Sequence, residues 1–152
     1  MRGFRFRLEK LRGLRWAEEQ EKARRLAEAG TALDRAQGIL ERIAESEAGV
    51  QSRMRDALEE APTAGVVQNL MVLLDAMRRQ RTAAEEDRAA ALDQVVEATT
   101  QLQEATRERK ILDRLRDRHR GEWVREERQR EQSILDEANR GRHQRLGDEL
   151  GS

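Results

Sequence analysis

Pro62, the only proline among the 152 residues, constrains the fold more than any other residue. It separates two long segments that both carry helical patterns and few strand-like alternations. A proline inside a helix loses a hydrogen bond and clashes with the preceding turn, at a cost of about 3 kcal/mol, and it disfavours helical geometry at the residue before it. Thr63 can then cap a new helix, and Gly65 adds backbone freedom. The chain is therefore predicted to reverse here and run back along itself.

The composition predicts long helices around a thin core. Charged residues make up 39% of the chain and aromatic residues only 3%, a profile typical of coiled coils. We therefore expect an all-α fold, an antiparallel two-helix coiled-coil hairpin that forms a single domain over residues 1–152. Its parts are a first arm over about 5–60, a turn over about 61–65, a second arm over about 66–139 and a frayed tail over 140–152, where glycines recur.

A heptad pattern predicts which face of the first arm packs. Two series of residues seven apart, offset by three, describe a coiled-coil seam from residue 26 onward. Glu47 interrupts one of them. Before residue 18 the pattern is weaker and consists of Phe4, Leu8, Leu11, Leu14 and Trp16. The two series are Leu26, Leu33, Leu40, Glu47 and Met54, and Ala29, Ala36, Ile43, Val50 and Ala57.

The second arm carries a matching seam, in which long arginines can lay their methylenes on the seam and keep their charge in water. If the turn centres between residues 63 and 64, the numbers of facing residues add up to about 127. Trp123 would then lie opposite Phe4, and the aromatic rings would close the open end of the hairpin. The seam positions are Met77, Ala84, Ala91, Ala98, Ala105 and Leu112, and, in the other series, Arg81, Arg88, Val95, Leu102 and Arg109.

The formal charge is zero, but its distribution is uneven. Residues 1–15 hold six basic and one acidic side chain, and residues 107–145 hold thirteen basic and nine acidic ones. Residues 16–106 hold eleven basic and eighteen acidic side chains. In a hairpin the two basic blocks meet, so the open end is predicted to be basic and the body acidic.

The sequence contains no recognisable motif for catalysis or cofactor binding. There is no cysteine, and His119 and His143 belong to no metal-ligand motif and are interpreted as surface helix residues. The glycines are scattered and form no phosphate loop. We expect no enzyme activity, no cofactor and no metal site. Arginine and glutamate alternate too closely after residue 107 to favour nucleic acid, and the basic stretches lack the broad apolar face of a membrane-binding helix.

Two further features concern location. The first residues lack the apolar core and cleavage site of a secretory signal, and no run approaches the roughly 20 apolar residues of a membrane span. We therefore expect a soluble protein without direct membrane insertion.

The most apolar stretch of the chain, residues 66–77, follows the turn directly. One helical stripe needs only Val66, Leu70, Leu73 or Leu74, and Met77. Val67, Met71 and Val72 widen the apolar surface beyond that stripe, as in helices that contact more than one neighbour. Two interpretations remain open: the stretch closes the turn, or it docks a partner.

Five stretches stand in a fixed order along the chain: Phe4-Arg5-Phe6-Arg7-Leu8-Glu9-Lys10-Leu11, Glu18-Glu19-Gln20-Glu21-Lys22-Ala23, Arg107-Glu108-Arg109-Lys110, Glu126-Glu127-Arg128-Gln129-Arg130-Glu131-Gln132 and Leu135-Asp136-Glu137. In these stretches the sequence resembles the FliJ family, a soluble component of the bacterial flagellar type III export apparatus. The mid-chain turn agrees as well, so the resemblance covers nearly the whole chain.

The resemblance implies a cytoplasmic, stalk-like adaptor associated peripherally with the inner face of the cell membrane. Such a protein inserts its open end into the export ATPase hexamer, promotes the assembly of that hexamer, contacts the export-gate membrane protein near the turn and holds export chaperones. The residues implied for the export gate are Leu70, Leu73 and Met77. Those implied for the ATPase are Arg5, Arg7, Leu8, Leu11, Arg12, Arg15, Arg116, Trp123, Arg128 and Asp136.

Two alternatives remain open beside a monomeric export adaptor. One is a structural coiled coil, which could form a dimeric four-helix bundle through Val67, Met71 and Val72. The other is the equivalent stalk protein of a virulence type III secretion system.

Overall fold

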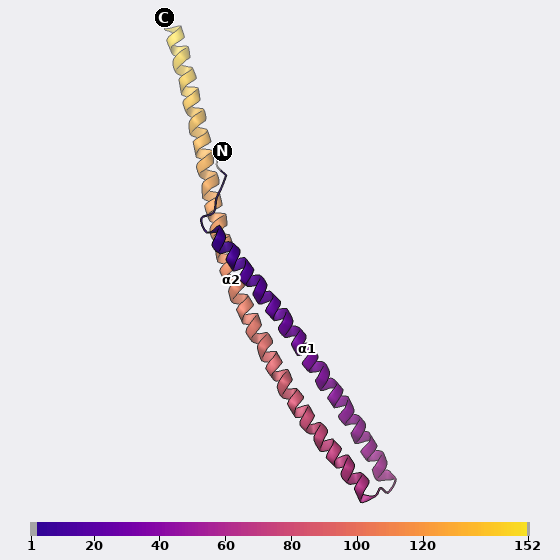
Figure 1. Cartoon of the computed structure of the whole chain (residues 1–152). Helices are drawn as coiled ribbons and strands as arrows, with labels where there is room; N and C mark the ends of the chain where they lie inside the picture. Colours follow the sequence, from indigo (N-terminus) through magenta and orange to yellow (C-terminus); the bar gives the residue numbers. More distant parts are fainter. Residues whose placement is uncertain (1–2, 152) are drawn as a thin grey trace. The chain divides into compact units, whose positions relative to one another are not determined.

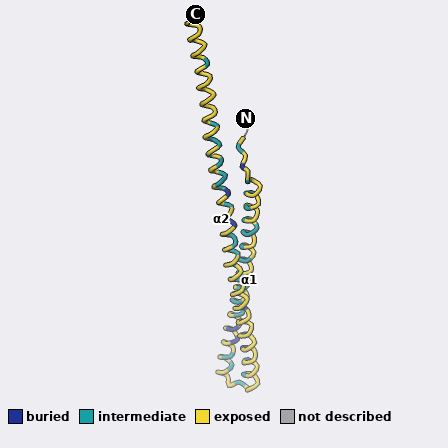
Figure 2. Tube along the Cα trace, turned by 90° about the vertical axis from the view of Figure 1, so that its left-hand side faces the viewer, coloured by how far each residue is buried: buried dark blue, intermediate teal, exposed yellow. Residues whose placement is uncertain are grey.

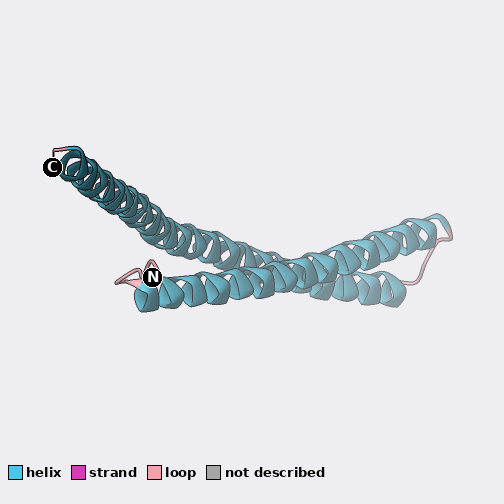
Figure 3. Ribbon diagram, turned by 90° about the horizontal axis from the view of Figure 1, so that it is seen from above, coloured by secondary structure: helices cyan, strands magenta, loops and turns pink. Residues whose placement is uncertain are grey.

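A computed structural model describes residues 3–151 of the chain, and these residues contain two helices and no strand (Figure 1, Figure 3). Helix α1 spans Glu9–Glu59 and α2 spans Ala64–Leu150. The two helices pack against each other, which confirms the predicted all-α hairpin. The chain divides into two compact units. The turn unit comprises Glu18–Ala105, and the terminal unit comprises Met1–Ala17 with Thr106–Ser152.

The turn forms where the proline predicts it, although its bounds differ by a few residues. The peptide N–H of Val66 lies 3.4 Å from the side-chain oxygen of Thr63, so Thr63 caps α2 as expected. Gly65 already belongs to the first turn of α2. The residue with left-handed geometry is instead Ala61, at a φ of 52°. It directly precedes Pro62, whose ring disfavours the ordinary helical geometry there.

In the turn unit, α1 and α2 run antiparallel and side by side, and the predicted heptads are the packed face (Figure 1, Figure 2). All ten predicted seam positions of α1 from Leu26 to Ala57 are buried or half-buried, whereas most of their neighbours are exposed. Small alanines in the facing series of α2 allow the close approach, with Ala84 only 6% exposed. Leu74, rather than Leu73, supplies the buried leucine near the turn.

Glu47 does not break this seam but lies buried within it, 4% exposed. Its carboxylate accepts a hydrogen bond of 2.8 Å from Arg81 Nη1, and Arg78 Nε lies 3.9 Å from its other oxygen. Burial of a carboxylate in an apolar seam is tolerated only with such partners. Arg81 therefore forms an ion pair with Glu47, the buried acid of α1, in addition to covering the seam with its methylenes.

In the terminal unit, the chain before α1 lies beside α2 without being helical, so the expected helix start near residue 5 was wrong. Residues two apart in a helix point roughly 200° away from each other. In the non-helical segment both Phe4 and Phe6 reach α2 instead. The ring of Phe4 lies 6.2 Å from that of Trp123, which confirms the predicted pairing, and the ring of Phe6 lies 5.7 Å from that of His119.

The predicted end of the second arm near residue 139 was also wrong. Helix α2 continues through residues 140–150, and the peptide N–H of Gly151 donates to the carbonyl oxygen of Gly147 over 3.0 Å. A glycine in a helix costs about 1 kcal/mol relative to alanine, but it removes no backbone hydrogen bond. Residues 140–150 contain no proline, so the helix is not interrupted there. Its side chains are nearly all exposed (Figure 2).

Candidate functional site

The seam of the terminal unit combines the buried Leu112, 8% exposed, with ion pairs along its sides. Arg12 Nε lies 2.7 Å from Asp113 Oδ1, and Arg15 Nη1 lies 2.9 Å from Glu108 Oε2. Arg116 Nε lies 3.7 Å from Glu9 Oε2. These three pairs join α1 to α2 in the same antiparallel register as the two ring pairs.

Asp113 is the centre of the most connected of these ion pairs. Its two carboxylate oxygens accept hydrogen bonds from Arg12 and, over 2.6 Å, from Arg109 Nη1. The hydrogen bond from Arg12 is the main reason that the pKa of Asp113 lies below its usual value, and Arg109 lowers this pKa further, while partial burial opposes both. The same hydrogen bond to Asp113 is the main reason that the pKa of the Arg12 guanidinium is raised. The arrangement is a clamp between the two helices.

The clamp predicts a loss of stability in acid. Because the pKa of Asp113 is lower in the folded chain than in the unfolded chain, its contribution is fully present above the unfolded value of 3.8. It is then lost as the pH falls through the folded value. Asp113→Asn should therefore lower the melting temperature near pH 7, and the difference from the wild-type chain should shrink only below about pH 4. Thermal unfolding followed by circular dichroism from about pH 7 to about pH 2 tests this.

Asp117→Asn is the matched control, because Asp117 is an exposed carboxylate one helical turn away. Its melting temperature should follow that of the wild-type chain across the series. A gap between Asp113→Asn and wild type that stays constant below pH 4 would show that the carboxylate charge does not act as described.

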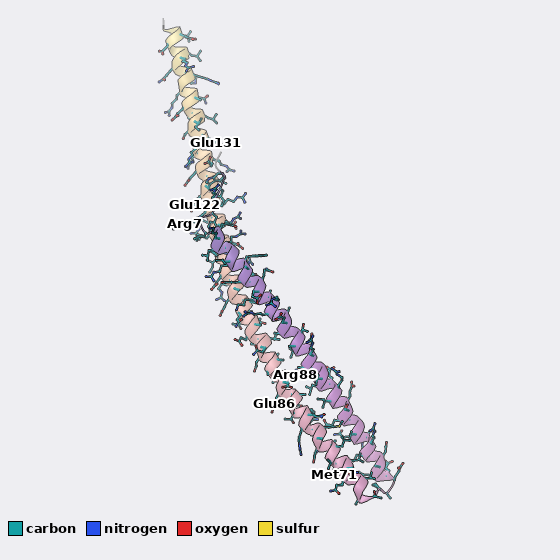
Figure 4. All side chains as sticks on the ribbon, viewed as in Figure 1. Arg7, Met71, Glu86, Arg88, Glu122 and Glu131 are labelled. Atoms are coloured by element: carbon teal, nitrogen blue, oxygen red, sulfur yellow. The ribbon has the colours of Figure 1, made fainter. Side chains whose placement is uncertain are left out.

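The ten residues implied for ATPase binding separate into three groups in the terminal unit. Arg12, Arg15 and Arg116 are engaged in the ion pairs above, and Leu8 and Trp123 are half-buried. The remaining five are exposed, although Leu11 only to 37%: Arg5, Arg7, Leu11, Arg128 and Asp136. Figure 4 labels Arg7 where the N-terminal segment lies beside α2, and Asp136 belongs to the stretch of α2 beyond it.

The structure also corrects the interpretation of His119. It was expected on the open surface, but it is half-buried and its ring meets Phe6 edge-on, at 61° between the ring planes. Phe6 is the most buried residue of the N-terminal segment, at 8% exposure. The predicted register contained the signal for this contact, since the numbers of Phe6 and His119 add up to nearly the same value as those of Phe4 and Trp123.

Near the turn, the three residues implied for gate binding do not share one environment. Leu70 and Met77 are half-buried in the seam, whereas Leu73 is 43% exposed. Met71 lies beside the connection between the helices (Figure 4). The exposed apolar residues that follow the turn, which we name the turn surface, are Val66 at 46%, Met71 at 54%, Val72 at 65% and Leu73 at 43% exposure.

Residues 3–151 contain neither a membrane-spanning stretch nor a metal-binding cluster. Neither helix contains an apolar stretch sufficient to cross a membrane. Within the same span, no three His, Asp or Glu side chains are grouped so that they could hold a metal ion.

The fold and its surfaces define a class of protein, a two-helix coiled-coil hairpin with a polar seam in its terminal unit and an apolar surface at its turn. The family model described as "Flagellar FliJ protein" matches residues 4–147. The chain therefore belongs to the FliJ family, whose members are components of the flagellar export apparatus. No curated protein and no solved structure matches the chain.

Proposed function

We propose that this protein is a stalk-like, non-catalytic adaptor of the flagellar export apparatus, which inserts its terminal unit into the export ATPase hexamer and promotes assembly of that hexamer. Membership of the FliJ family supports the assignment to the flagellar export apparatus. The basic character of the terminal unit supports the mode of binding, since a basic segment is steered toward an acidic ring lining.

The exposed cations support this proposal more directly than the ion-paired cations do. Arg5, Arg7 and Arg128 are exposed and make no ion pair with another described residue, so their charge is available to a partner. Arg12, Arg15 and Arg116 already neutralise carboxylates of α1 or α2. We therefore assign the electrostatic contact to the first group and the shape of the inserted unit to the second.

The turn surface has a separate role in this proposal, as the contact with the export-gate membrane protein. Its support is the exposed apolar area at residues 66–73, which the seam does not use. The chain would act in the cytoplasm as a monomer when free, reach the inner face of the membrane through the gate, and escort export chaperones. Neither a nucleic acid nor a cofactor has a part in it.

The test is stimulation of a cognate export ATPase by the purified chain. The wild-type chain should raise both the rate of ATP hydrolysis and the share of hexamers in mass photometry. The triple variant Arg5→Glu, Arg7→Glu and Arg128→Glu should need about tenfold more protein for the same effect at low salt, because it loses electrostatic steering.

Arg79→Glu provides the control for position, with one charge reversal instead of three, since Arg79 is an exposed cation of the turn unit and makes no ion pair with a described residue. It should stimulate the ATPase as the wild-type chain does. If the wild-type chain leaves both rate and assembly unchanged, the proposed function is wrong. If Arg79→Glu is as weak as the triple variant, net charge acts and the terminal unit is not the binding end.

A further inference from the structure

Four aliphatic side chains of the terminal unit lie on one flank of its polar seam. The ion pair between Arg15 and Glu108 marks this flank. Leu11 precedes Arg15 by one helical turn, and Leu115 follows Glu108 by two turns, so both lie on the marked side. Leu14 and Ile111 lie next to them on their own helices, at spacings of three and four residues.

The register places these residues opposite one another in pairs. In the ion and ring pairs that join α1 or the segment before it to α2 in this unit, the two residue numbers add up to between 123 and 127. The same holds for Leu11 with Leu115 and for Leu14 with Ile111. Two helices therefore contribute one aliphatic surface, which we name the lateral patch.

The lateral patch is apolar surface that the hairpin does not bury. Leu14 is 62% exposed, Ile111 57% and Leu11 37%, while Leu115 is half-buried. The seam next to the patch is already occupied by Leu112, 8% exposed, and by the charged pairs of Arg12 and Arg15, so the four patch residues lie at its margin. These aliphatic residues therefore contribute little to the core of the terminal unit, and their exposure calls for a partner.

Cations border the patch on its outer side. Lys10 lies one turn before Leu14, Arg107 and Arg114 lie one turn on either side of Ile111, and Arg118 lies one turn after Leu115. All four are exposed and make no ion pair with another described residue. Two acids of this flank are occupied, since Glu108 is paired with Arg15 and Glu18 also has a partner, while Glu122, one turn after Arg118, is an exposed acid at the end of the border.

We infer that the lateral patch docks an amphipathic helix with acidic flanks, supplied by a partner protein. A helix laid along two antiparallel helices presents apolar residues at spacings of three, four and seven, which suits rows of aliphatic side chains from both. Acidic flanks would meet the cationic border. A second copy of this chain does not fit, because a two-fold interface would set the same cations against each other.

This inference goes beyond the proposed function, since three of the four patch residues, Leu14, Ile111 and Leu115, are not among those implied for the ATPase, of which the patch shares only Leu11, and no ATPase enters the test. The probe is a helix-stabilised synthetic peptide with leucines on one face and glutamates on both flanks, labelled for fluorescence anisotropy. A second peptide keeps the leucines and carries lysines instead of glutamates. The acidic peptide should bind the full chain at least tenfold more tightly than the basic peptide.

Variants of the chain locate the binding. Leu14→Glu with Ile111→Glu should weaken the acidic peptide at least tenfold. The pair Arg114→Glu and Arg118→Glu should reverse the preference between the two peptides. The control is Ile134→Glu with Leu135→Glu, which changes two aliphatic residues of similar exposure, 65% and 63%, on the distal part of α2. It should leave the affinity unchanged.

Circular dichroism should show that the variants remain helical, because the altered side chains are exposed. Absence of binding, equal affinity for both peptides, or equal losses in the Leu14/Ile111 and Ile134/Leu135 variants would overturn the inference. So would sedimentation that shows the wild-type chain to dimerise and the Leu14/Ile111 variant to stay monomeric, because the patch would then bind a second copy.

Discussion

Replacing Arg78 and Arg81 together with alanine is expected to lower the free energy of unfolding by about 3 kcal/mol. Both arginines serve the carboxylate of Glu47, which is 4% exposed in the seam. Without them the carboxylate stays buried among apolar side chains with no cation, or the two helices must separate to let water reach it. Removing one partner of a buried pair is for this reason far more costly than removing both.

Glu47→Leu should behave in the opposite way, because leucine continues the heptad series and leaves no buried charge. Its free energy of unfolding should equal or exceed that of the wild-type chain. Urea denaturation followed by circular dichroism measures both variants, and Arg79→Ala should stay within about 0.5 kcal/mol of wild type. If the double arginine variant is as stable as Arg79→Ala, Glu47 is not held by these ion pairs.

Leu74→Ala is expected to lower the free energy of unfolding by about 2–3 kcal/mol, whereas Leu73→Ala should change it by less than 1 kcal/mol. Leu74 is 8% exposed and fills the seam beside the turn, so its truncation leaves a cavity. Leu73 is 43% exposed and belongs to the turn surface. Urea denaturation of the two neighbouring variants compares them directly.

The same two variants separate structure from docking at the turn. Under the proposed function, Leu73→Ala should weaken binding to the cytoplasmic part of the export-gate protein, measured by calorimetry, without loss of helicity. Met77, which is half-buried in the seam, is a poorer probe because its truncation alters packing as well. Unchanged gate binding by Leu73→Ala, together with weakened binding by Leu74→Ala, would mean that the turn region is structural and not a docking site.

The sequence predicted the turn unit well because one physical rule dominates there. Apolar residues seven apart must face a partner, and from Leu26 to Ala57 they do. The cap by Thr63 follows in the same way from local chemistry next to a proline. Of the predicted gate residues, however, only Leu73 is largely exposed, since hydrophobic spacing alone does not distinguish it from its buried neighbour Leu74.

In the terminal unit the same rule held for Leu112 of α2, which is 8% exposed, but not for the start of α1. Leu11, Leu14 and Trp16 continue an apolar pattern, yet they are exposed at 37%, 62% and 57%. The seam instead passes through Arg12 and Arg15, whose partners lie on the other helix. A charged seam has no hydrophobic periodicity, and its carboxylates can be recognised only once the register is known.

By itself, the sequence determined where the chain reverses and which heptad series meet, because proline geometry and residue spacing act over a few residues. Only the tertiary structure decided which charges pair and where the first helix begins. The paired residues Arg81 and Glu47 are 34 positions apart in the sequence, and Arg12 and Asp113 are 101 positions apart. Helix α1 begins only at Glu9, and in the non-helical segment before it the ring of Phe6 lies against that of His119 of the other helix. Such contacts depend on the register of two helices, which no local segment encodes.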